Sequence, residues 1–117
     1  MTSKFELSDV VHRQLGPSGF MEFARFDLGN VLREPPSGHA GQSLRLVVGN
    51  PLIMRKMVER VADAGSYAPV TILVDERADG VHVSYDRMAS YLASYQDADA
   101  LATARDLDAK VEALVLG

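Results

Sequence analysis

The side chains that could do chemistry in this chain are few, and they stand apart from one another in the sequence. They are polar residues within or beside apolar segments, and the candidates for ligand binding are Arg25, Asp27, Asn50, Asp75, His82, Ser84 and Tyr85. These groups offer hydrogen bonds and charge pairing around a small ligand or around the end of a partner chain. No catalytic signature occurs in the 117 residues, so binding is favoured over catalysis.

Nucleophiles and metal ligands lack the settings that their chemistry needs. Ser18, Ser84 and Ser90 have no Gly-x-Ser-x-Gly environment, and no histidine and carboxylate are evident partners for them. The chain has no cysteine, which excludes disulfides and thiolate zinc sites. A metal would depend on three histidines, of which His12 and His39 lie in segments without a clear pattern. We therefore expect no metal, and the sequence identifies no cofactor.

"VVGNPLIM", residues 47 to 54, permits two interpretations of its Gly-Asn-Pro. The free N–H groups and the dipole of a helix N-terminus could hold an anion there. Alternatively, Asn50 caps a helix whose first residue is Pro51, and the three residues are a joint. We favour the joint, because the glycines, lysine and hydroxyl of a phosphate-binding loop do not follow.

Other polar groups also have a structural and a functional interpretation. Asp75 and Glu76 could act as paired carboxylates, but adjacent strand residues point to opposite faces, so solvated turn charge is expected. His82 could carry protons with Asp27 or Tyr85 nearby, although an exposed or packed histidine is expected. A further group of residues could line a cleft or belong to the core or to a dimer contact: Tyr67, Tyr85, Met88, Tyr91 and Tyr95.

Composition limits the classes of partner. The formal charge of −4, from 12 basic and 16 acidic residues, is unlike the basic surface of nucleic-acid binders. No apolar run has the length of a signal peptide or of a membrane span, so we expect a cytoplasmic protein without a membrane partner. The length and the 47% hydrophobic content predict a single domain over residues 1–117.

Hydrophobic periodicity predicts the elements that must position the candidates. Strands are expected over 20–27 and 43–49, and a hairpin turns around Asp79-Gly80 between Val70 and Tyr85. A helix is expected from Pro51 to a left-handed Gly65. The remaining predictions are a short helix over 8–15, a linker over 33–42, a helix ending near 95, and a last helix with an apolar seam over 100–114. This order predicts an α+β domain whose antiparallel sheet has helices packed on one face.

Three segments carry a resemblance to a known family: "FARFD" at 23–27, "LVVGNP" at 46–51 and "APVTILVDERADGVHVSYD" at 68–86. From about residue 20 to 114 the chain resembles the family called domain of unknown function 302, with residues 1–19 as an abbreviated N-terminal part. The resemblance implies a small bacterial protein with a fold similar to a TATA-binding-protein half-domain, and a homodimer. It implies no activity, and the fold similarity implies nothing about DNA.

Two departures from the family pattern alter any pocket built from it. Leu28 follows Asp27, where members often carry a histidine, and "LIMRKM" follows Gly-Asn-Pro in place of small residues. Three functions stay open on this basis. The first is a binding or interaction module with a pocket between sheet and helices. The second is a cofactor-dependent enzyme or redox accessory that uses Arg25, His82 and Tyr85 on an anionic or aromatic compound. The third is a structural dimer that buries the 100–114 seam between subunits.

Overall fold

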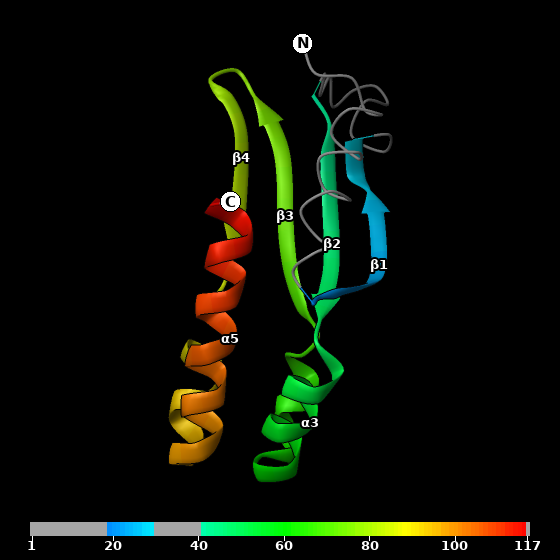
Figure 1. Cartoon of the computed structure of the whole chain (residues 1–117). Helices are drawn as coiled ribbons and strands as arrows, with labels where there is room; N and C mark the ends of the chain where they lie inside the picture. Colours follow the sequence, from blue (N-terminus) through cyan, green and yellow to red (C-terminus); the bar gives the residue numbers. More distant parts are fainter. Residues whose placement is uncertain (1–18, 30–40, 117) are drawn as a thin grey trace.

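Four segments build an antiparallel sheet, seen in a computed structural model that describes residues 19–29 and 41–116. The strands are β1 (Met21–Asp27), β2 (Ser43–Gly49), β3 (Val70–Arg77) and β4 (Gly80–Tyr85). They lie side by side in the order β1-β2-β3-β4 (Figure 1). The strands and the hairpin predicted from the sequence are therefore confirmed.

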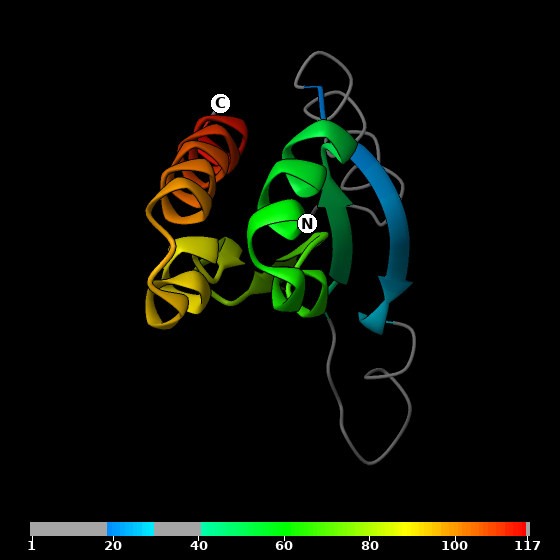
Figure 2. The same cartoon turned by 90° about the horizontal axis from the view of Figure 1, so that it is seen from below.

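The helical elements follow β2 and β4. They are α3 (Pro51–Arg60), the 3-10 segment η2 (Ala62–Ser66), α4 (Met88–Leu92), the 3-10 segment η3 (Ala93–Tyr95) and α5 (Ala98–Leu116). Figure 2 shows α3 and α5 on the same side of the curved sheet. This arrangement confirms the α+β class with helices on one face of an antiparallel sheet. Within the described residues, no helix has both the length and the apolar character to cross a bilayer.

The register of the strands decides which side chains meet the helices. Leu44 pairs with Val74, Leu46 pairs with Ile72, and all four side chains are buried. Directly opposite residues of an antiparallel pair share a face, so β2 and β3 present one continuous apolar surface to the helices. On the other face, Arg45 is exposed and Val47 is half-buried, whereas Ser43 is buried.

The Gly-Asn-Pro joint has the predicted structure. The Oδ1 atom of Asn50 accepts hydrogen bonds from the N–H groups of Leu52 at 3.0 Å and Ile53 at 3.3 Å. Pro51 occupies the first helical position, where its missing N–H costs nothing. Asn50 is therefore a helix cap.

The end of α3 differs from the prediction. The helix stops at Arg60, and Val61 adopts an extended conformation with φ −135° and ψ 101°. This bend carries Val61 and the buried Ala64 toward the core, and a 3-10 turn follows. Gly65 is not left-handed, because the described glycines with positive φ are Gly19 and Gly80. The prediction of a Gly65 cap is wrong.

The apolar seam of α5 packs inside the chain. Ala104, Leu107 and Val111 are fully or almost fully buried, and α5 contacts α3 and α4. The prediction that this seam is buried between subunits is therefore wrong, since the subunit's own core occupies it. The break before α5 is confirmed, because Gln96 has a left-handed φ of 57°.

Several predictions fall on other parts of the chain. The helix over 8–15, His12, Ser18, His39 and residues 33–40 of the linker lie outside the described residues.

Candidate functional site

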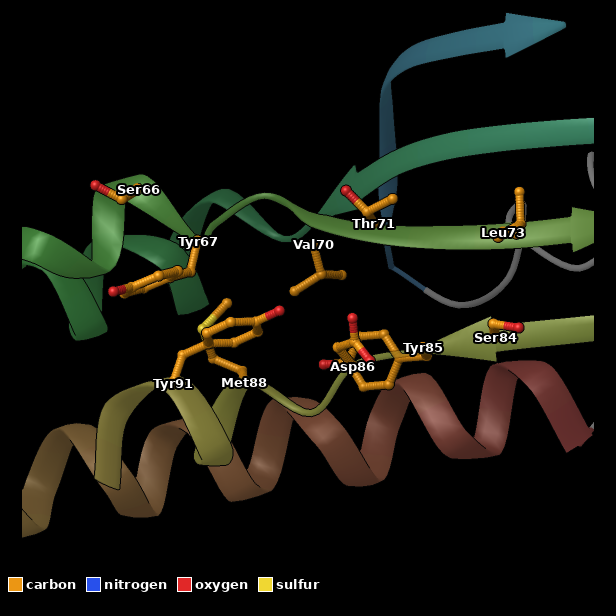
Figure 3. A pocket seen from close by; sticks show the side chains of 10 residues that line it. All are labelled: Ser66, Tyr67, Val70, Thr71, Leu73, Ser84, Tyr85, Asp86, Met88 and Tyr91. Atoms are coloured by element: carbon orange, nitrogen blue, oxygen red, sulfur yellow. The ribbon is translucent and has the colours of Figure 1, made fainter. Parts of the chain in front are cut away.

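A pocket of about 350 Å³ lies where β3 and β4 separate, beside η2 and α4. Val70 and Thr71 stand at the start of β3, and Tyr85 stands at the end of β4. Figure 3 shows the ten side chains that line the pocket: Ser66, Tyr67, Val70, Thr71, Leu73, Ser84, Tyr85, Asp86, Met88 and Tyr91. The pocket therefore combines apolar side chains with several hydroxyl groups, which is typical of a small-molecule site.

Two stacked tyrosines form one side of the pocket. The rings of Tyr67 and Tyr91 have their centroids 4.7 Å apart and are inclined by 16° (Figure 3). The Tyr67 hydroxyl is also 3.2 Å from the Tyr95 hydroxyl. This hydrogen bond, with burial, raises the pKa of Tyr95 to about 12. The stack joins the residue that follows η2 to α4, so this side of the pocket is built from segments before and after the hairpin.

Asp108 of α5 holds the opposite side in place. Its Oδ1 atom accepts hydrogen bonds from the Tyr85 hydroxyl at 2.5 Å and from the Met88 N–H at 2.8 Å. Its Oδ2 atom accepts a bond from the Ala89 N–H at 3.0 Å. Asp108 is only 5% exposed, so these three donors replace the water that the carboxylate loses. Burial and the bond to Asp108 both raise the pKa of Tyr85.

Sequence reasoning missed Asp108. It lies four residues after Ala104, on the same face of α5 as that buried residue. An acidic residue on an apolar helix face was the available signal, because a buried carboxylate needs donors from another element. The identity of those donors depends on how α5 packs, which the sequence pattern does not specify.

The electrostatics of the pocket favour a neutral or cationic ligand. Among the described residues that line it, Asp86 alone carries a formal charge. The carboxylate of Asp108 lies behind Tyr85 and adds negative potential. Hydroxyl groups of Thr71 and Ser84 can donate or accept hydrogen bonds. An anionic ligand would therefore meet unfavourable charge here.

The structure brings only part of the predicted site together. Ser84 and Tyr85 line the pocket. Arg25 forms an ion pair of 2.7 Å with Glu22 on β1, and Asp27 pairs with Leu44 of β2. Because β2 and β3 separate β1 from β4, Arg25 and Asp27 share no site with Tyr85.

His82 is partly exposed, and it does not meet Asp27 as the functional alternative required. Its Nε2 atom is 2.6 Å from Asp79 Oδ1 in the hairpin turn, and this contact lowers the pKa of Asp79. Asp27 lies across the sheet on β1, so the suggested pairing of His82 with Asp27 is wrong. His82 and Arg25 therefore cannot act together with Tyr85 as the enzymatic hypothesis required.

Asp75 corrects another expectation. It is 8% exposed, within a strand that continues to Arg77, so its interpretation as solvated turn charge is wrong. The reason is that Gln42 continues the pairing: its carbonyl accepts from the Glu76 N–H at 2.8 Å. Asp75 Oδ2 accepts a 2.8 Å bond from the half-exposed Arg77, whose pKa it raises. Asp75 and Glu76 do point to opposite faces, because Asp75 pairs with Ser43 and His82, whereas Glu76 pairs with Val81, which has its side chain on the other face of β4.

No metal centre is formed by the described histidine and carboxylate side chains, since no three of them converge. Asn50 is occupied by capping α3, and its Nδ2 atom also donates a 3.4 Å bond to the Gly19 carbonyl. The candidate site is therefore the tyrosine-lined pocket.

Comparisons with known proteins agree with this fold. No curated protein matches the chain. The crystal structure of an uncharacterized conserved protein DUF302 from Bacillus stearothermophilus is similar, with a TM-score of 0.82 and 17% sequence identity. The similarity covers 97% of this chain and 88% of that one, and at this identity it shows the fold alone.

The family is decided by a sequence match that covers most of the chain. The pattern of Domain of unknown function DUF302 matches residues 2–115. This range includes the three segments that carried the resemblance, at 23–27, 46–51 and 68–86. The chain therefore belongs to the DUF302 family.

Proposed function

We propose that this protein is a cytoplasmic, non-enzymatic binding module that holds a small flat molecule in the tyrosine-lined pocket. The observation that carries the proposal is the pocket itself, about 350 Å³ in volume, between the Tyr67–Tyr91 stack and Tyr85. Aromatic rings offer a large apolar surface to a flat ligand, and their hydroxyl groups add directional contacts. A volume of this size suits a small ligand.

The chemistry of the lining selects the ligand class. Tyr67, Tyr85 and Tyr91 provide ring surface, while Asp86 provides the formal charge. A carboxylate beside aromatic faces attracts an amine, because both the charge and the ring quadrupole favour a cation. We therefore propose an aromatic or otherwise flat ligand that is neutral or carries an amine.

Three probes of similar size separate these properties in calorimetric titration. They are tyramine, 4-methylphenol and 4-hydroxybenzoate, which share a phenol ring and differ in charge. We expect tyramine to bind most tightly and 4-hydroxybenzoate most weakly, because Asp86 repels a carboxylate. Equal binding of the amine and the acid would contradict the proposed ligand class, and failure of all three to bind would count against the pocket.

A matched pair of variants then locates the binding. Ser84→Phe places a large ring at the pocket, while His82→Phe places the same ring two residues away on the same face of β4. We expect Ser84→Phe to weaken tyramine binding at least tenfold and His82→Phe to leave it within about twofold. Equal effects of the two variants would place the binding elsewhere.

We also propose that the protein works as a homodimer. The support is the exposed apolar surface at one edge of the sheet, where Val81 and Val83 are 49% and 41% exposed. Exposed apolar side chains on an edge strand are typical of a surface that pairs with another chain. Sedimentation across a range of protein concentrations tests this, and a monomer at every concentration would contradict it.

A further inference from the structure

β4 is an edge strand whose outer side is open. It is the last strand in the sheet order, and no described strand lies beyond it (Figure 1). Val81 and Val83 lie on the same face of the sheet as Val74. Val74 is buried in the core, whereas Val81 and Val83 are exposed. Strand edges of this kind recruit further strands.

The backbone of β4 has groups available for pairing. Arg77 pairs with Gly80 across a two-residue turn, and the closing pair of such a hairpin is hydrogen-bonded. Successive residues of an antiparallel strand direct their backbone groups alternately toward and away from the neighbouring strand. The N–H and C=O groups of Val81, Val83 and Tyr85 therefore point away from β3. Outside the ladder, no backbone bond among the described residues reaches these groups.

The opposite edge of the sheet is less regular, although Met21, Phe23 and Phe26 of β1 are also exposed. β1 carries an irregular register between Glu22 and Ala24, and Arg25 forms its ion pair with Glu22 beside it. Bulges and charged side chains are the usual means of preventing edge pairing. β4, with sequence GVHVSY, has no proline, lysine or register shift. The two edges are therefore not equivalent, and β4 is the better edge for association.

A groove continues the open surface onto α5. It has a volume of about 380 Å³ and lies between Val83 and Tyr85 of β4 and Val111, Val115 and Leu116 of α5, and the ion pair of Arg87 with Glu112 also lines it. Leu116 is 87% exposed at its rim. A strand added to β4 would thus lie next to apolar side chains that face solvent in the single chain.

We infer that a second copy of this chain pairs with β4, antiparallel and about a two-fold axis at Val83. This inference rests on the proposed self-association and names its surface. In this register Val83 faces the partner's Val83, and Val81 faces the partner's Tyr85. All these side chains lie on the same face of the joined sheet, since their pairing partners in β3 do.

Charge complementarity selects this register. Asp79 in the turn would face the partner's Arg87, which follows β4, and the two-fold axis repeats the pair. Both side chains are mostly exposed, at 75% and 67%, although each already contacts a residue of its own chain, His82 and Glu112 respectively. Their exposed sides can therefore form the additional contact.

Neighbouring registers are less favourable. An axis at His82 would set Arg87 against the partner's Arg77, which places like charges opposite each other. An axis at Ser84 would keep Val83 opposite the partner's Tyr85 but set Val81 against the partner's Arg87, so fewer apolar residues would face one another. The Val83 axis is the arrangement in which apolar residues face one another and opposite charges meet.

Cross-linking tests which edge pairs. The chain has no cysteine, so a single Val83→Cys variant reports contact between equivalent positions of two copies. Phe23→Cys on β1, at similar exposure of 46%, is the matched control. With a short thiol-specific bifunctional reagent, we expect a covalent dimer from Val83→Cys in at least tenfold excess over the control. A dimer that cross-links through Phe23→Cys and not through Val83→Cys would overturn the inference.

Charge exchange tests the register by sedimentation. We expect Asp79→Arg and Arg87→Asp each to raise the dimer dissociation constant about tenfold, because two symmetry-related pairs are lost. The double variant should recover most of the affinity, and no recovery would overturn the register. Circular dichroism confirms that each variant is folded.

The outcomes also separate this inference from the proposals on which it builds. A dimer that is unaffected by Val83→Lys and by both charge variants would overturn the β4 interface and leave the homodimer proposal in place. A monomer at every concentration would overturn both. Tyramine binding is measured independently, so either result leaves the pocket proposal to its own test.

Discussion

The hydroxyl of Tyr85 donates a 2.5 Å hydrogen bond to Asp108, which joins the last residue of β4 to the middle of α5. The same carboxylate accepts from two N–H groups at the start of α4, the helix that carries Tyr91. One side chain thus orients Tyr85 and α4 around the pocket. The shape of the pocket depends on a residue that does not line it.

Replacement of Asp108 should reveal this dependence. We expect Asp108→Ala to lower the free energy of unfolding by about 3 kcal/mol, because two backbone N–H groups and a buried hydroxyl lose their acceptor. Urea denaturation measures the loss. Asp106→Ala removes an exposed carboxylate of the same helix and should cost less than about 0.5 kcal/mol. Similar losses of unfolding free energy in Asp108→Ala and Asp106→Ala would show that the hydrogen bonds of Asp108 do not stabilise the fold.

Tyrosine ionisation should report the environment of Tyr85. The chain has four tyrosines and no tryptophan, so phenolate absorbance can be followed directly. Because burial and Asp108 raise the pKa of Tyr85, this residue should stay protonated at a pH where free tyrosine ionises. The stability from its neutral form is present below the ordinary value of 10.0 and is lost only as pH rises through the higher folded value.

The assignment can be checked with Tyr85→Phe. The tyrosine that ionises at the highest pH should disappear from the titration of this variant. The ionisation of Tyr95, with a pKa of about 12, should remain. An unchanged late phase in the variant would assign that phase to another tyrosine.

Asp97 should make the free energy of unfolding decrease at acidic pH. Its bond from the Ala100 N–H, at 2.9 Å, lowers its pKa from the ordinary value of 3.8, and Arg60 adds to the effect. Stability from this carboxylate is therefore present above 3.8 and is lost as pH falls through the lower folded value. Asp97→Ala should be less stable than the natural chain at pH 7, and the difference should narrow below pH 3.8 in thermal melts.

Asp97→Asn is the matched control for that prediction. Its amide oxygen can still cap α5, but it does not titrate in this range. We expect near-normal stability at pH 7 and a weaker acid dependence. A pH dependence equal to that of the natural chain would show that Asp97 is not responsible.

The Val111→Asp variant tests whether the apolar seam of α5 is buried within the subunit or between subunits. Val111 is fully buried within the chain, so an unpaired carboxylate there should destabilise the fold by roughly 4 kcal/mol or more. Ala109→Asp, at an exposed position of the same helix, should have little effect on unfolding. If Val111→Asp only dissociated a folded dimer, the internal placement of the seam would be incorrect.

The sequence predicted those parts of the fold that depend on local pattern. Alternation in β2 and β3, the Asn50-Pro51 cap and the seam of α5 all follow from the spacing of neighbouring residues, and the structure confirms them. The end of α3 was missed because Val61 leaves the helix to pack against the core. Burial of Val61 depends on tertiary packing, which its neighbours in the sequence do not reveal.

The site was predicted less well than the fold. Ser84 and Tyr85 line the pocket, as do three of the residues considered for a cleft, Tyr67, Met88 and Tyr91. Residues on β1 were grouped with Ser84 and Tyr85 although two strands lie between. Asp75 was taken for solvated turn charge because adjacent strand residues point to opposite faces, yet β3 continues through it to Arg77 and its side chain is buried. Sequence order gives no distance across a sheet, so the convergence of polar residues could not be inferred.

The cap that Asp108 supplies to α4 also bears on the order of folding. A helix of five residues has too few internal hydrogen bonds to persist alone, and α4 has no capping side chain of its own. Its first turn therefore forms stably only after α5 has docked and delivered the carboxylate. During synthesis the sheet precedes α5 along the chain, so the pocket wall that carries Tyr91 should be among the last parts to become protected from hydrogen exchange.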